Sequence, residues 1–178
     1  MSFALRRTDR SGEWIERVAY PWHVLHTRAR NEKRVAEALE QAGIVHYLPL
    51  ARVEHTYAKR RATFLVPLFA GYVFVSGGPE ACELARGTHR VAAVLEVSDQ
   101  DAFRRELRQI YRVVERGQAL ELFPALREGQ RCRVTSGPLR GLEGVVLRHG
   151  QRCRMYLSVS TLGQSAVVEV TAAQLEPA

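Results

Sequence analysis

The chain has 178 residues, of which 26 are basic and 19 acidic, and its formal net charge is +7. That length allows one ordinary domain or two small ones, and the dispersed charge is unlike the block charge of a nucleic-acid-binding tail. No apolar run reaches membrane-spanning length and the N-terminus lacks the apolar core of a signal peptide, so we expect a cytoplasmic protein without membrane contact.

Strand and helix patterns alternate from residue 22 onward. Residues 1–20 are polar and mixed in charge, and we expect them to form a loose extension. Residues 22–27 read WHVLHT, a β-rich run that predicts a first strand. Apolar residues at helical spacing over 35–42 predict a helix, with Asn31 as its N-cap and Gly43 as its C-terminal stop.

The next segment predicts strands on either side of a polar connection. Residues 44–50 predict a second strand, and residues 54–62 are polar and basic, as expected of a connection. The run FLVPLFAGYVFV at residues 64–75 is strand-like on both sides of Pro67 and Gly71.

Two helices with a strand between them follow. Residues 79–87 predict a short helix that a proline opens and a glycine ends, and residues 90–97 predict a strand. Ser98 and Asp101 make a capping-box-like start to a longer helix, which Gly117 ends. The apolar residues of this helix share one face; they are Phe103, Leu107, Ile110 and Val114.

These patterns divide the chain into two folded units and a joint. Over residues 21–114 the order of strands and helices predicts helices packed on an open, mostly antiparallel sheet. Residues 115–126 form the predicted linker. Residues 127–178 hold short alternating apolar runs between glycine turns, which predict a small closed β-barrel. The alternation over residues 153–159 and the helix-breaking glycines favour a stable barrel over a helical hairpin.

The chain has no sequence motif of an enzyme or a metal site. Six histidines are scattered without metal-ligand spacing, and there is no GxSxG, P-loop or paired-carboxylate motif. We therefore expect no catalysis, no cofactor and no metal. Cys82, Cys132 and Cys153 are widely spaced, and we expect them to be buried as small apolar residues in a reducing compartment.

Four motifs in this order resemble the NusG family of transcription elongation factors. WHVLHTRARNEKRVAEALEQAGI resembles the first strand and helix of the family's N-terminal domain, and VPLFAGYVFV resembles its PLFPGYVFV signature, with Ala70 in place of the second proline. GPLRGLEGVV resembles the core of a KOW motif, and LSVSTLGQSAVVEV the last strands of its barrel. The resemblance implies an α+β fold: a NusG-type N-terminal α/β sandwich with a mostly antiparallel sheet, followed by a small SH3-like β-barrel, the KOW domain.

The resemblance also implies a function. Parts of the sequence, such as HTRARNEKRVAEAL and LGQSAVVEV, resemble the specialised RfaH- and UpxY-like antiterminators more than housekeeping NusG. We therefore expect a monomeric elongation and antitermination factor that binds RNA polymerase and promotes processive transcription of selected operons. Two alternatives remain open: a housekeeping NusG-like elongation factor, and a KOW-type RNA- or ribosome-binding protein, which would have no need of VPLFAGYVFV.

Candidate contacts with RNA polymerase follow from the same resemblance. The family's N-terminal domain binds the clamp helices of the largest polymerase subunit through an apolar depression. The matching positions are His26, Leu68, Phe69 and Tyr72. Protein interfaces need such aromatic or aliphatic anchors. Strand alternation also requires that some of Leu68, Phe69 and Tyr72 belong to the core.

Candidate DNA contacts gather at the start of the first predicted helix: Arg28, Arg30, Lys33 and Arg34, with only Glu32 opposing them. Such a cluster attracts phosphates, and the resemblance to RfaH-like proteins implies the non-template DNA strand as its ligand. An ordinary solvated basic surface is the alternative.

Residues 59–61 form a second basic patch, in a polar loop or a solvated hairpin, and residues 88–90 match a loop that faces polymerase in relatives.

In the KOW domain, residues 162–164 match a turn that contacts a ribosomal protein or the terminator Rho in NusG. Leu162 lacks the aromatic ring of the family's phenylalanine, and Gln164 lacks the guanidinium of its arginine. We therefore expect no binding of Rho, whereas ribosome contact stays open. The alternative for this segment is a purely structural turn.

Overall fold

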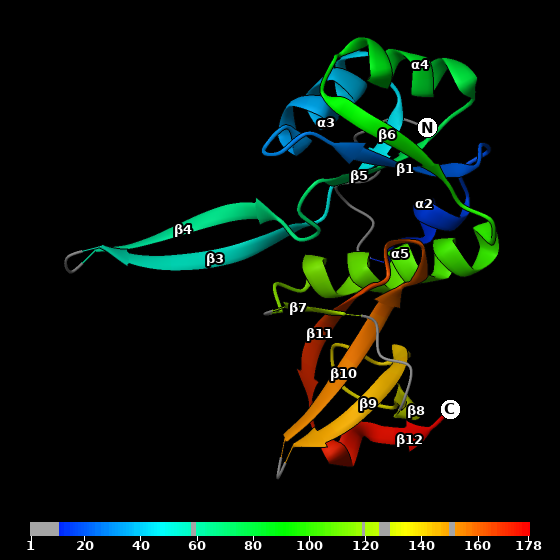
Figure 1. The fold of residues 1–178 in the computed structure, drawn as a ribbon. Coiled ribbons are helices and arrows are strands. Elements are labelled where there is room, and N and C mark those ends of the chain that lie inside the picture. The colour runs from blue at the N-terminus through cyan, green and yellow to red at the C-terminus, as the bar shows by residue number, and fades with distance from the viewer. Residues whose placement is uncertain (1–10, 58–59, 119, 125–128, 150–151) are drawn as a thin grey trace. The chain divides into compact units, whose positions relative to one another are not determined.

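The computed structural model describes residues 11–57, 60–118, 120–124, 129–149 and 152–178 (Figure 1). The chain divides into two compact units. One covers residues 17–101, and the other combines the segment up to Glu16 with residues 102–178. The expected α+β fold is confirmed: helices and a fully antiparallel sheet in the first unit, and a small antiparallel β domain in the second.

A four-stranded antiparallel sheet forms the first unit, in the order β2-β5-β1-β6. Its strands are β1 (Trp22–Thr27), β2 (Val45–Tyr47), β5 (Tyr72–Ser76) and β6 (Val91–Glu96). The predicted bounds of the first strand are confirmed. The second predicted strand is shorter than expected, because the chain leaves the sheet after Tyr47. The run at 64–75 divides as predicted, with a turn between Pro67 and Tyr72.

Helices α3 (Glu32–Gln41) and α4 (Pro79–Gly87) pack on one face of this sheet (Figure 1). The core between them consists of Leu25, Val35, Leu39, Val73, Val75, Ala81 and Ala85. Both helices were predicted, and Gly43 ends α3 in the left-handed conformation at φ +69°. Asn31 is the N-cap residue of α3, as predicted, and its carbonyl accepts a hydrogen bond from the Val35 amide at 2.9 Å. Its side chain makes no capping hydrogen bond and donates instead to the carbonyl of Ala29.

A hairpin of β3 (Leu50–Tyr57) and β4 (Arg60–Pro67) extends from the first unit as a separate two-stranded sheet (Figure 1). The prediction of a polar connection over 54–62 is therefore wrong. Polar residues such as Thr63 and Glu54 face each other across an antiparallel ladder that satisfies their backbone groups. The apolar residues Phe64, Leu65 and Val66 on β4 are exposed.

The second unit contains the helices α2 (Glu13–Glu16) and most of α5 (Gln100–Glu115), together with a six-stranded antiparallel sheet in the order β12-β8-β9-β10-β11-β7. The strands are β7 (Glu121–Pro124), β8 (Gln130–Val134), β9 (Glu143–His149), β10 (Arg152–Val159), β11 (Gln164–Val170) and β12 (Leu175–Pro177). Two 3₁₀ turns, Ser160–Leu162 and Ala172–Gln174, lie between the last strands. Strand β7 lies inside the segment predicted as a linker and pairs with β11.

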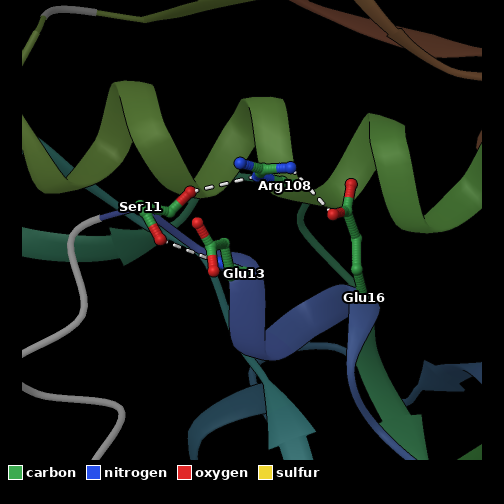
Figure 2. Close-up of polar contacts among 4 residues, drawn as sticks. All are labelled: Ser11, Glu13, Glu16 and Arg108. Carbon is green, nitrogen blue, oxygen red and sulfur yellow. Dashed lines mark hydrogen bonds and ion pairs between the residues drawn. The ribbon is translucent and has the colours of Figure 1, made fainter.

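Residues 11–16, which the sequence placed in a loose extension, pack against α5. Trp14 and Ile15 are buried, and the Trp14 ring meets the ring of Tyr111 edge-on at 5.6 Å between centroids. Arg108 donates to the carbonyl of Ser11 at 3.2 Å and to the carboxylate of Glu16 at 2.8 Å (Figure 2). The rest of the predicted extension before residue 11 lies outside the described residues.

The core of the β domain follows the predicted alternation along β10. Cys153, Met155, Leu157 and Val159 are all buried. Tyr156, on the opposite side of the strand, is also buried. Glycine is required at position 144 because a Cβ there would lie 2.6 Å from the backbone oxygen of Tyr156. The described residues of this region form strands rather than a helical hairpin, as the sequence predicted.

The expected burial of the cysteines is confirmed, because Cys82, Cys132 and Cys153 are free and buried. Burial raises the pKa of the Cys82 thiol above its usual value, although the nearby cation of Arg86 opposes that shift. On α5, burial lowers the pKa of the Arg112 guanidinium, and the neighbouring cations Arg116 and Arg108 act in the same direction.

Candidate functional site

The predicted polymerase contacts centre on a pair of rings at the end of β1 and the start of β5. His26 and Tyr72 face each other in the antiparallel register. Their rings stack with centroids 5.1 Å apart and planes at 24°. His26 is exposed and Tyr72 half-buried, so the pair forms a small aromatic surface.

Leu68 and Phe69, the other two predicted contacts, lie in the interior. Leu68 is 4% exposed and Phe69 is fully buried. The Phe69 ring meets Phe74 edge-on, with centroids 6.0 Å apart. A side chain without exposed surface cannot contact a partner directly, so Phe69 packs in the core instead of lying on the proposed contact surface.

The turn over residues 68–71 joins these interior residues to the exposed pair. Gly71 adopts φ +84°, a conformation that residues with a Cβ rarely adopt. Its amide donates to the carboxylate of Glu32 at 2.7 Å, and its carbonyl accepts from the amide of Thr27 at 2.7 Å. The turn is therefore bonded both to the start of α3 and to the end of β1.

Sequence reasoning missed Glu32, which it treated only as a charge opposing the basic cluster. Glu32 is the first residue of α3 and is 6% exposed, whereas Glu37 and Glu40 of the same helix are exposed. A buried acidic residue is uncommon, and the helical spacing places Glu32 three residues before the buried Val35. That spacing was the available signal, since it puts the carboxylate on the inward side of the helix.

The basic cluster follows His26 along the chain. Arg28, Arg30 and Arg34 are exposed, and Arg30 adopts φ +61° in the tight connection between β1 and α3. Lys33 is also exposed, but its ammonium donates to the carbonyl of Leu65 at 2.7 Å. The arginines thus present their charge to solvent, whereas Lys33 also binds the hairpin.

The two secondary basic segments have different surroundings. Arg60 and Arg61 begin strand β4, and Lys59 lies outside the described residues. At the end of α4, the Thr88 hydroxyl donates to the carbonyl of Ala85 at 2.7 Å and accepts from the amide of Arg90 at 3.2 Å. Local hydrogen bonds therefore define the 88–90 loop.

The predicted contacts in the β domain lie on either side of a tight turn. Leu162 ends a 3₁₀ turn and Gln164 begins β11, and both are half-buried. Gly163 between them has φ +61°. Ser160 in the same turn binds the carboxylate of Glu106 through its amide at 3.0 Å and its hydroxyl at 2.5 Å.

Within the described residues, no group of three histidine, cysteine or acidic side chains is placed to hold a metal ion. Nor does that part of the chain contain a helix long and apolar enough to cross a membrane.

Comparison with known proteins identifies the family. The family model described as "Transcription termination factor nusG" matches residues 20–122, more than half of the chain. The structure titled "Domain interaction in Thermotoga maritima NusG" is similar in fold, with a TM-score of 0.51 and 19% identity over 88% of this chain and 96% of that one. Conformation A of the MjSpt4:Spt5 complex aligns with a TM-score of 0.29 and 14% identity over 88% and 97% of the two chains. No curated protein matches by sequence. Because the family model covers most of the first unit and more than half of the chain, the protein belongs to the NusG family of transcription factors.

Proposed function

We propose that this protein is a transcription elongation and antitermination factor that binds the clamp helices of the largest RNA polymerase subunit. The stack of the exposed His26 on the half-buried Tyr72 carries this proposal. Tyr72 lies in the segment that resembles the family signature, and His26 lies in the one that resembles the family's first strand, in a chain that belongs to the family. Aromatic side chains dominate the binding energy of protein interfaces, and a rigid stacked pair loses little entropy on binding.

The buried segment before Tyr72 suits the pair to this role, because the Tyr72 amide donates to the Phe69 carbonyl at 3.2 Å. Phe69 and Phe74 pack edge-on in the interior, and Leu68 is buried beside Phe69 in the sequence. Interface anchors are most effective when their own positions are fixed by packing. We therefore assign direct contact to His26 and Tyr72, and a supporting role to Leu68 and Phe69.

The basic cluster supports a second contact, with the non-template DNA strand. Arg28, Arg30 and Arg34 are exposed and lie within eight residues of His26 along the chain. Phosphate contacts from arginine are bidentate and depend strongly on salt. Lys33 has three donor hydrogens, so it can bind Leu65 and still offer hydrogens to a phosphate.

The β domain supports a specialised role over a housekeeping one. Leu162 and Gln164 offer neither an aromatic ring nor a guanidinium to a partner, so the proposal includes no binding of Rho. The protein would act as a cytoplasmic monomer without a cofactor. Recruitment of a ribosome through this turn is an alternative role, which binding to ribosomal subunits tests.

Binding of the full chain to core RNA polymerase, and to the isolated clamp-helix coiled coil, tests the proposal. The double variant His26→Ala/Tyr72→Ala should weaken both interactions about thirtyfold or more, as expected for the loss of interface aromatics. Tyr20→Ala is the matched control, because Tyr20 is an aromatic residue that is 58% exposed. Unchanged affinity of a folded double variant would overturn the assignment.

A transcription assay tests the biological role. On a template with a terminator inside a long transcribed region, the protein should increase read-through and lower pausing. Equal activity on every template, together with binding of Rho, would favour a housekeeping elongation factor. Co-sedimentation with ribosomal subunits, without binding to polymerase, would favour a KOW-type ribosome-binding protein.

A further inference from the structure

Glu32 is a buried acidic residue whose carboxylate has a specific backbone partner. It is 6% exposed and accepts a hydrogen bond from the Gly71 amide at 2.7 Å. A buried carboxylate is costly unless hydrogen bonds and local charge compensate it. Here the hydrogen bond and the N-terminal end of α3, which favours negative charge, supply that compensation.

The Gly71 peptide is held from two sides. Glu32 binds its amide, and the amide of Thr27 binds its carbonyl, each at 2.7 Å. With φ at +84°, this peptide sets the direction in which the chain enters β5. Removing either hydrogen bond would leave a backbone group of the turn without its partner.

Gly71 also lies against one of the two stacked rings. A Cβ built on Gly71 would lie 3.6 Å from Cδ2 and 3.7 Å from Nε2 of His26. The next residue, Tyr72, stacks on the same ring. A shift of the Gly71 peptide would therefore change the position of both aromatic side chains.

The residue after Glu32 binds the other end of the same segment. Lys33 donates from its ammonium to the carbonyl of Leu65 at 2.7 Å. The first turn of α3 thus holds residues 65–71 at both ends, through two adjacent side chains of opposite charge. This segment connects strand β4 to the aromatic pair.

We infer that Glu32 is a positioning residue that fixes the Gly71 turn and thereby the geometry of the His26–Tyr72 pair. The consequence for polymerase binding rests on the proposed function. The effect on the pair itself is a property of the free protein. A contact surface that is loosened by even about 1 Å loses much of its affinity, so a residue without partner contact can control binding.

Nuclear magnetic resonance of the full chain tests the positioning directly. In the wild type, the Gly71 amide should exchange slowly with solvent, and cross-relaxation should connect the rings of His26 and Tyr72. Glu32→Ala removes the acceptor and should shift the Gly71 amide and both ring resonances. Glu32→Gln keeps an acceptor oxygen and should preserve them. Glu37→Ala, at an exposed acidic position of the same helix, is the control.

Two results would overturn the inference even if Glu32→Ala failed to fold. One is rapid exchange of the Gly71 amide in the wild type. The other is a folded Glu32→Gln variant in which the ring resonances of His26 and Tyr72 shift as far as they do in Glu32→Leu, a variant that has no acceptor. Unchanged ring resonances in a folded Glu32→Ala variant would also overturn it.

Affinity for core RNA polymerase then separates this inference from the proposed function. Glu32→Ala should weaken binding about tenfold, because the Gly71 amide loses its acceptor. Glu32→Gln should keep most of the affinity, because the glutamine oxygen still accepts that hydrogen bond, although as a neutral acceptor it does so more weakly. If the wild-type protein does not bind core RNA polymerase, the proposed function is rejected. The ring resonances then still decide whether Glu32 positions the aromatic pair. If the wild-type protein binds polymerase and Glu32→Ala binds with the same affinity, Glu32 has no role in recognition.

Discussion

Arg108 of α5 and Glu16 of α2 form an ion pair at 2.8 Å between residues 92 positions apart in the chain (Figure 2). The same guanidinium also binds the carbonyl of Ser11 at 3.2 Å. The pair is about one-third exposed on each side, so solvent screens it. It orients α2, whereas burial of Trp14 and Ile15 supplies most of the attachment.

The first prediction follows from this contact. Trp14→Ala should lower the free energy of unfolding by about 3–5 kcal/mol, because a buried indole leaves a cavity. Arg108→Ala should cost about 1 kcal/mol or less, since its ion pair is partly exposed. Urea denaturation followed by circular dichroism measures both, with Tyr20→Ala as an exposed aromatic control. If Trp14→Ala and Tyr20→Ala lower the free energy of unfolding equally, α2 is not part of the core.

The second prediction separates packing from recognition within the aromatic segment. Phe69→Ala should lower the free energy of unfolding by about 3–5 kcal/mol, because Phe69 is fully buried. Tyr72→Ala should cost less stability but should weaken polymerase binding by about 2 kcal/mol, as an interface anchor would. Denaturation curves and binding isotherms for the two single variants give the comparison. A Tyr72→Ala variant that loses stability and keeps its affinity would reverse the assignment.

The third prediction concerns DNA. Replacing Arg28, Arg30 and Arg34 with alanine should reduce crosslinking to the displaced non-template strand in an elongation complex. Each lost phosphate contact should also lower the slope of log affinity against log salt by about 0.7. Arg86→Ala, at an exposed position on α4, is the control and should leave both unchanged. Crosslinks of wild-type intensity in the triple variant would exclude this cluster as the DNA contact.

The fourth prediction concerns the β domain. Its amide shifts should be those of β-strands both in the full chain and in a fragment of residues 120–178. A shorter fragment of residues 127–178 lacks β7, so the amides of Gln164 to Val167 that pair with it should exchange faster. Helical shifts across residues 131–160 in the full chain would instead indicate a domain that changes fold.

The fifth prediction concerns thiol chemistry. Burial raises the pKa of Cys82, so its reactive thiolate fraction at a given pH is smaller than that of an unfolded cysteine. The neutral thiol favours the folded state, and that contribution is lost as pH rises above the unfolded value. Alkylation by iodoacetamide near pH 8, mapped by mass spectrometry, should therefore be slow in buffer and fast in urea. Rapid labelling of the native protein would contradict the burial of this residue.

Local sequence signals predicted much of the fold. Strand β1 has the predicted bounds, α4 begins at Pro79 and ends at Gly87 as expected, and Gly117 adopts the left-handed conformation that follows α5. Period-two alternation correctly placed Met155 in the core of the β domain. These features depend on residues close together in sequence, through capping, backbone restriction and the period of one strand or helix. The family resemblance likewise required only ordered local motifs.

Other features depend on residues far apart in the chain, and only the tertiary structure decided them. Trp14 is buried because α5, about a hundred residues later, packs against it, although most of the residues around it in sequence are polar. Residues 54–57 and 60–62 form strands because each strand satisfies the backbone groups of the other, a pairing that composition does not reveal. Phe69 and Tyr72 belong to one apolar run, yet only packing decides which ring is buried and which is presented. The hydrogen bond from Gly71 to Glu32 joins residues 39 positions apart, and no local pattern specifies such a pair.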